Sequence, residues 1–238
     1  MGRAFACPGR SGKARKDSCM MMKENGAPFA SNRPAGEPGG GLSESLRALP
    51  VTVALVLINI AIFLLLNQDG ELFGRGLMSG FFVRYAGEWH RLLTAMFLHA
   101  DINHLAGNML WLACGGNLLE RAMGHGRFFC LYMLAGLSGN LTTLVYEAVS
   151  RDYFFSLGAS GATFGLVGAL VAMRLKKDHR VRRIGAVELI WLLILLFYNG
   201  SLSSGVNLWA HLGGLAGGFA FGLLFGAGRR MGKAFDLE

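Results

Sequence analysis

Ser160 and His211 are the two residues of this sequence best suited to acyl-transfer chemistry. Ser160 lies in the small-residue segment Gly158-Ala159-Ser160-Gly161, and His211 lies in a second apolar, glycine-rich segment. A neutral imidazole within about 2.6 to 3.2 Å of a serine hydroxyl can take its proton and make the oxygen a nucleophile. A single serine in an apolar helix usually serves packing. The prediction of a catalytic serine therefore depends on whether His211 can reach it.

A second polar cluster could stabilise the anion that acyl transfer creates. His104 and Asn108 are four residues apart, so they share one face of a helix. An imidazole N–H and an amide N–H aimed at one point would form an oxyanion hole. Two alternatives stay open, because Asn108 could instead bond a neighbouring helix and His99 could simply orient the preceding loop.

No carboxylate is placed to complete a catalytic triad. Glu120 follows Asn108 by about 18 Å along a helix, so we predict a Ser–His dyad and expect structural hydrogen bonds or interfacial solvation for Glu120. A lipase-type site is excluded because Ala162 replaces the last glycine of GxSxG and no α/β alternation surrounds it. A zinc site is not expected, since the histidines lack the HExxH pattern. We predict no metal and no cofactor.

The composition indicates that membrane helices must position these residues. The 238-residue chain is 53% hydrophobic and 16% charged, with a mean hydropathy of +0.41, which is too apolar for an ordinary soluble domain. A spanning helix needs about 20 largely apolar residues. The predicted fold is all-α, a polytopic bundle of six transmembrane helices at 49–66, 104–119, 128–146, 154–173, 184–198 and 206–227. The fifth is short and carries Glu188, which we expect near a helix end.

Positive charge predicts the orientation of these helices. Lys and Arg collect in the first 47 residues, beside every second connection and after residue 228, which places those segments in the cytoplasm. This distribution explains the net charge of +8, so no nucleic acid partner is expected. The predicted organisation is a basic cytoplasmic tail (1–47), a membrane domain (48–228) and a short cytoplasmic tail (229–238). We expect the loops 67–103, 147–153 and 199–205 to lie on the outer side of the membrane.

Glycines predict that the helices of Ser160 and His211 approach each other closely. Both residues lie toward the outer ends of their helices, at similar depth. Small residues spaced three and four apart let two membrane helices pack backbone against backbone. On one helix these are Gly161, Gly165 and Gly168, and on the other Gly213, Gly214, Gly217, Gly218 and Gly222.

Together these motifs resemble the rhomboid family of intramembrane serine proteases. The similarity covers about residues 49–227 and includes the ordered His99, His104 and Asn108, the segment around Ser160, and Ala210-His211-Leu212-Gly213-Gly214. It also includes Glu88-Trp89-His90-Arg91 and Gly116-Asn117-Leu118-Leu119-Glu120.

The resemblance implies a function and a set of roles. Ser160 would be the nucleophile and His211 the base, while His104, Asn108 and the Ser160 N–H would form the oxyanion hole. His99, Gly158, Gly161 and Phe164 would support them. The expected substrates are single-spanning membrane proteins with weakened helices, cut in or near their transmembrane segments. The expected location is a bacterial cytoplasmic membrane, with both termini cytoplasmic and the site open to the outer face.

Two departures from the family pattern are visible. His90 intervenes between Trp89 and Arg91, so the sequence assigns Arg91 no particular contact. Phe164 stands where many bacterial members carry Tyr, and its ring can still stack on the histidine. The main alternative is a catalytically inactive relative that binds membrane proteins, which usually lacks the serine or the histidine. A transporter is disfavoured because no inverted repeat is visible.

Overall fold

The computed structural model describes residues 49–66, 70–181, 185, 190 and 207–225. The two predicted tails, 1–47 and 229–238, lie outside the described residues. So do the loop 199–205 and the predicted fifth helix, 184–198, apart from Gly185 and Ile190.

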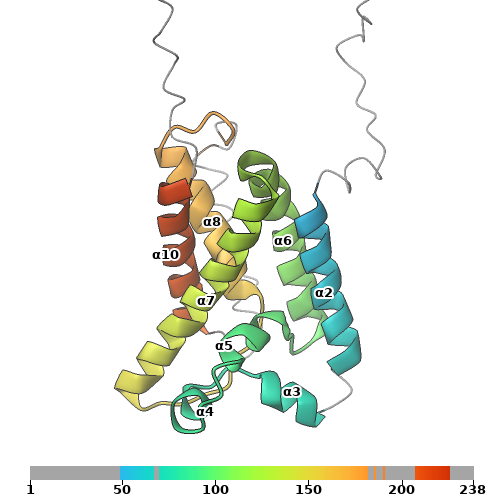
Figure 1. Cartoon of the computed structure of the whole chain (residues 1–238), viewed down its shortest axis with the longest axis vertical. Coiled ribbons are helices and arrows are strands. Elements are labelled where there is room, and N and C mark those ends of the chain that lie inside the picture. The colour runs from blue at the N-terminus through green and yellow to red at the C-terminus, as the bar shows by residue number, and fades with distance from the viewer. Residues whose placement is uncertain (1–48, 67–69, 182–184, 186–189, 191–206, 226–238) are drawn as a thin grey trace, which may run out of the picture. The chain divides into compact units, whose positions relative to one another are not determined.

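Five long helices form the described bundle (Figure 1), and the prediction of an all-α fold is confirmed for this part of the chain. Helix α8 packs against α10 and α7, and α2 packs against α6. Two described helices, α7 and α10, are long and apolar enough to cross a membrane, and α2 and α8 are shorter apolar helices. The five are α2 (Pro50–Leu66), α6 (Ile102–Met123), α7 (His125–Ser150), α8 (Ser160–Leu175) and α10 (Leu208–Phe225).

The helix predicted at 154–173 begins later than expected, at Ser160. Ser156 exchanges two backbone hydrogen bonds of 2.9 Å with Met78, and the Gly158 N–H donates to the Ala95 carbonyl at 2.8 Å. These contacts keep residues 154–159 out of a helix although the segment is apolar. The prediction of a helix from residue 154 was therefore wrong, and Ser160 is the first residue of α8.

The described part of the loop predicted at 67–103 begins at residue 70 and contains four short helices: α3 (Gly70–Gly76), α4 (Gly80–Tyr85), α5 (Arg91–Thr94) and the 3-10 helix η1 (Ala95–Phe97). The buried Arg91 joins them. Its guanidinium donates to the Gly74 and Leu77 carbonyls, each at 2.8 Å, and to Glu88 at 2.6 Å. The structure thus gives Arg91 contacts that the sequence left unassigned.

Glycines allow α8 and α10 to touch through their backbones. A Cβ at Gly214 would overlap the Gly161 carbonyl, and a Cβ at Gly218 would overlap the Gly165 carbonyl. Any larger side chain would push the helices apart. The predicted close approach of these two helices is confirmed.

Glu120 joins the end of α6 to the start of α2. Its buried carboxylate accepts hydrogen bonds from the backbone N–H groups of Val51, at 3.0 Å, and Thr52, at 2.8 Å. It also lies 2.6 Å from Nδ1 of His125. The predicted structural hydrogen bonding of Glu120 is confirmed.

Candidate active site

The structure places Ser160 and His211 within hydrogen-bond distance. Nε2 of His211 lies 2.9 Å from Oγ of Ser160, although the residues come from different helices. His211 lies in the first turn of α10 and is buried, whereas Ser160 at the start of α8 is half-buried. The glycine contacts between α8 and α10 make this distance possible. The pair has the geometry that a base-activated serine requires.

Phe164 fixes the plane of the His211 imidazole. It lies one helical turn after Ser160 and is buried. The two rings stack with centroids 4.1 Å apart and planes 14° from parallel. An imidazole held against this flat surface keeps its Nε2 directed at Ser160. The stacking expected from the sequence is present.

The start of α8 can attract a negative charge beside Ser160. Ala159 precedes the helix and provides no side-chain cap. The first N–H groups of a helix have no carbonyl partner within it and carry the positive end of the helix dipole. The Ser160 N–H is among them. An anion that forms next to Ser160 would therefore meet a favourable local field.

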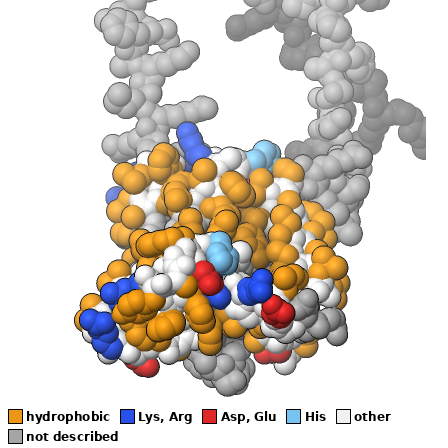
Figure 2. Space-filling model, turned by 60° about the horizontal axis from the view of Figure 1, so that its bottom comes forward, with side chains coloured by type: hydrophobic (Ala, Val, Ile, Leu, Met, Phe, Trp, Pro, Cys, Tyr) orange, Lys and Arg blue, Asp and Glu red, His pale blue; other side chains and the backbone are white. Residues whose placement is uncertain are grey.

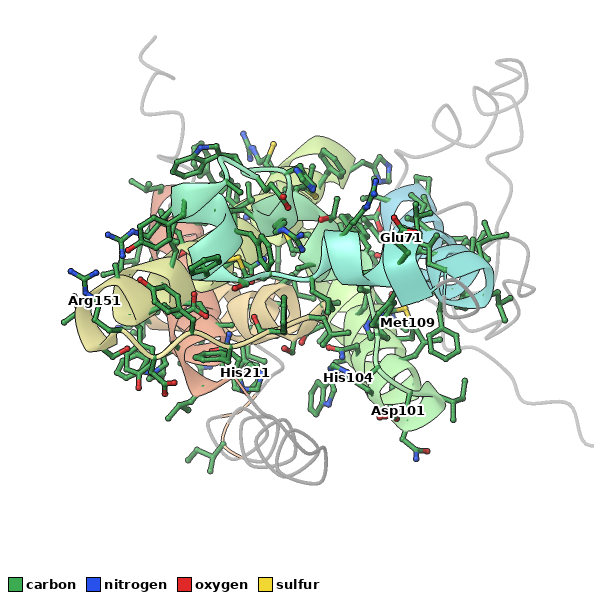
Figure 3. All side chains as sticks on the ribbon, turned by 90° about the horizontal axis from the view of Figure 1, so that it is seen from below. Glu71, Asp101, His104, Met109, Arg151 and His211 are labelled. Carbon is green, nitrogen blue, oxygen red and sulfur yellow. The ribbon has the colours of Figure 1, made fainter. Side chains whose placement is uncertain are left out.

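Gly158 allows the His104 ring to lie next to the turn that precedes Ser160. Its φ is +121°, a conformation that residues with a side chain rarely adopt. A Cβ here would lie 2.8 Å from Cε1 and Nε2 of His104. The absence of a side chain at Gly158 thus lets the His104 ring lie against the turn that leads into Ser160. Figure 3 shows His104 and His211 on the same side of the molecule, on α6 and α10.

Asn108 reaches α8 through a residue that the sequence analysis missed. Its amide donates to the His104 carbonyl at 3.0 Å, and its Oδ1 lies 3.5 Å from the hydroxyl of Thr163. That hydroxyl donates to the Ser160 carbonyl at 2.9 Å. Thr163 lies three residues after Ser160, so its position on the same helix face was the signal available in the sequence.

Asp101 and His99 both lie next to His104. The Asp101 carboxylate caps α6 and accepts from the N–H of His104 at 2.9 Å, as an aspartate before a helix often does. The ring of His99 lies 5.2 Å from that of His104. Burial lowers the pKa of His99 to about 3, so this imidazole is neutral near pH 7.

The described site can therefore supply three chemical groups. They are a hydroxyl nucleophile, a neutral imidazole that can accept its proton, and several N–H donors near the hydroxyl. A neutral imidazole has one accepting and one donating nitrogen, so His211 can serve as base while its other nitrogen keeps its proton. This set of groups is suited to acyl transfer at a carbonyl carbon.

Comparisons with known proteins identify the family. The rhomboid domain family matches residues 86–228. The rhomboid protease GluP of Bacillus subtilis is 39% identical over 56% of this chain, but the match spans 25% of GluP. YdcA of the same bacterium is 32% identical over 75% of this chain and 90% of its own length. RHOMBOID-like protein 5 of Arabidopsis thaliana is 34% identical over 58% of this chain and 44% of its own length.

The family match includes every residue of the candidate site, from His99 to His211. A rhomboid domain implies several membrane-spanning helices, in agreement with the apolar helices described above. The chain is a polytopic membrane protein that belongs to the rhomboid family of serine proteases.

Proposed function

We propose that the chain is an intramembrane serine endopeptidase that hydrolyses peptide bonds in or near the transmembrane segments of other membrane proteins. The observation that carries the proposal is the 2.9 Å distance between Ser160 Oγ and His211 Nε2. Membership of the family supports the same reaction.

In the first half of the reaction, His211 takes the proton of the Ser160 hydroxyl as its oxygen attacks the carbonyl carbon. A tetrahedral intermediate forms, and its oxygen carries the negative charge. We assign the stabilisation of this oxyanion to His104, Asn108 and the Ser160 N–H. The C–N bond then breaks, the amine leaves with the proton from His211, and Ser160 remains acylated.

In the second half, His211 takes a proton from water as the water oxygen attacks the acyl carbon. The bond to Ser160 Oγ breaks, and the proton returns to that oxygen. His211 thus acts as base and then as acid in each half. The glycines and Phe164 hold the dyad in place, and no metal or cofactor takes part.

We assign substrates to the class of single-spanning membrane proteins whose helices are locally weak. A peptide bond in a helix is inaccessible to Ser160 until the helix unwinds, and Gly or Pro lowers the cost of unwinding. The protein would work in a bacterial cytoplasmic membrane, with both termini cytoplasmic and the site open to the outer face.

The test is cleavage of a panel of single-spanning proteins in reconstituted bilayers. We expect products cut inside or next to Gly- or Pro-containing spans, and none with Ser160→Ala. Ser150→Ala is the matched control, because its exposed hydroxyl lies outside the dyad. Binding of the panel without cleavage by the wild-type protein would instead support an inactive, client-binding relative.

The proposed orientation has its own test. In a cysteine-free background, Asp152→Cys lies at the proposed outer end of α7 and Gly126→Cys at its inner end. A membrane-impermeant maleimide added to intact cells should label the first and spare the second. The opposite pattern would reverse the orientation.

A further inference from the structure

Among the described residues, two arginines at the active-site end of the molecule have no acidic partner. Four arginines of the described residues lie in the segments at this end. Arg75 and Arg91 each form an ion pair with a glutamate of their own loop, at 2.7 and 2.6 Å. Arg84 and Arg151 are exposed and have no carboxylate within 4.0 Å in the described part of the chain. Two positive charges are therefore available to a partner.

Arg84 and Arg151 converge on two tyrosine hydroxyls. Arg84 donates to the hydroxyl of Tyr153, and Arg151 donates to that of Tyr85, each at 3.4 Å. The two hydroxyls are 3.5 Å apart. These are long hydrogen bonds, and each guanidinium carries five N–H groups. The cluster therefore keeps donors for another acceptor.

The electrostatic environment of the cluster favours an anion. The hydrogen bond with Tyr153 and the positive charges of Arg84 and Arg151 lower the pKa of the Tyr85 phenol. Arg151 also has a φ of +63°, the left-handed conformation in which a helix more often ends with glycine. An arginine thus occupies a backbone conformation that is less favourable for it than for glycine.

One exposed aromatic ring contacts the tyrosines of the cluster, and a second lies two residues after Tyr153. Phe81 is 49% exposed, and its ring lies 5.2 Å from that of Tyr85 and 5.8 Å from that of Tyr153. Phe155, which stacks on Phe82, is 56% exposed. Tyr is enriched at membrane–water interfaces, and Phe is common on the apolar side of segments that lie in the interface. Basic side chains lie beside apolar ones on the face drawn in Figure 2.

The position along α7 agrees with an interfacial site. This helix is long and apolar enough to span a membrane and ends at Ser150, directly before Arg151. Figure 3 shows Arg151 pointing away from the bundle. The end of a span lies at the level of the lipid headgroups, where a phosphate would meet both guanidinium groups.

We propose that Arg84, Tyr85, Arg151 and Tyr153 form a binding site for the phosphate of an anionic phospholipid headgroup. Guanidinium groups bind phosphate oxygens with paired hydrogen bonds, and the two hydroxyls supply further donors. Phe81 and Phe155 contact the upper part of the acyl chains. The bound lipid links α4 to the segment between α7 and α8. The proposal is independent of proteolysis.

The test uses the full-length protein in bilayers that contain a photoactivatable phosphatidylglycerol with a diazirine high in one acyl chain. Cross-linked peptides are mapped by mass spectrometry. We expect adducts at residues 81–85 and 153–155, and a roughly tenfold decrease with Arg84→Gln/Arg151→Gln. Arg121→Gln/Arg127→Gln is the charge-matched control at the other end of α6 and α7, and it should keep these adducts.

A second variant and a competitor complete the experiment. Tyr85→Phe/Tyr153→Phe keeps the rings and removes only the hydroxyls, so it should label less than wild type while keeping its thermal midpoint. Excess inorganic phosphate should not compete, and a phosphatidylcholine probe should label weakly. Equal labelling by both lipids, or unchanged labelling of folded Arg84→Gln/Arg151→Gln, would overturn the proposal. Displacement of the lipid probe by inorganic phosphate would show that the site binds free phosphate and not a lipid headgroup.

Discussion

Phe164 lies flat against His211, with ring centroids 4.1 Å apart and planes 14° from parallel. The stacked ring limits rotation of the imidazole, and the Nε2 atom at the edge of the imidazole contacts Oγ of Ser160. Phe164 can in this way determine how often the base is correctly placed.

Replacing Phe164 should slow the chemistry of Ser160 without unfolding the bundle. Aromatic contacts of this kind contribute about 0.5 to 1.5 kcal/mol, so Phe164→Ala should react with a serine-directed probe about 2- to 10-fold more slowly. Phe164→Tyr keeps the stacked ring and serves as the control. Labelling of Phe164→Ala at the wild-type rate would show that the stack does not position His211.

The contact between α8 and α10 should tolerate no added methyl group. A Cβ at Gly214 would overlap the Gly161 carbonyl, so Gly214→Ala should cost about 1 to 3 kcal/mol or more and lower the thermal midpoint in detergent. Gly126→Ala is the matched control, because a Cβ there meets nothing within 4 Å. Equal midpoints for the two variants would contradict the backbone-to-backbone packing.

A comparison of Gly158 with Gly87 separates the effect of backbone strain from the effect of crowding against His104. Gly158 and Gly87 both have positive φ, but only at Gly158 would a Cβ approach the His104 ring, at 2.8 Å. Alanine should therefore destabilise the protein at both positions and reduce probe labelling of Ser160 only at Gly158. Comparable labelling in the two folded variants would argue against a placed His104.

The buried His99 should make the folded protein less stable in acid. Burial lowers its pKa to about 3, whereas an unfolded histidine has a pKa near 6.5. Between these values the unfolded state binds the extra proton, so the free energy of unfolding falls as pH falls from about 6.5, by at most about 1.4 kcal/mol per pH unit. The thermal midpoint of wild type should therefore fall relative to that of His99→Phe as the pH is lowered. Parallel profiles from about pH 7 to 4 would rule this out.

The residues of the candidate site could be predicted from the sequence because their roles demand particular types and spacings. Ser160 and His211 lie on helices whose glycines predicted close approach, and the structure places them 2.9 Å apart. Their catalytic roles remain a prediction. The all-α fold could be predicted from long apolar segments, which have no comparable alternative in a bilayer.

The turn before Ser160 could not be predicted from local sequence. Residues 154–159 are apolar enough for a helix, but long-range backbone bonds from Ser156 to Met78 and from Gly158 to Ala95 keep them out of a helix. The contacts of Arg91 were missed for a similar reason, since its acceptors are carbonyls of another part of the loop. Thr163 acts through a hydrogen bond to the Ser160 carbonyl and a 3.5 Å contact with Asn108 Oδ1, and no motif marks either of them.

The central claim is that His211 activates Ser160, and labelling with a fluorophosphonate tests it most directly because no substrate is needed. The purified protein in detergent is treated with the probe, and the adduct is located by mass spectrometry in wild type and in His211→Ala. We predict an adduct on Ser160 that is lost in His211→Ala while Gly126→Ala keeps it. Labelling of Ser160 that persists in folded His211→Ala would contradict the dyad.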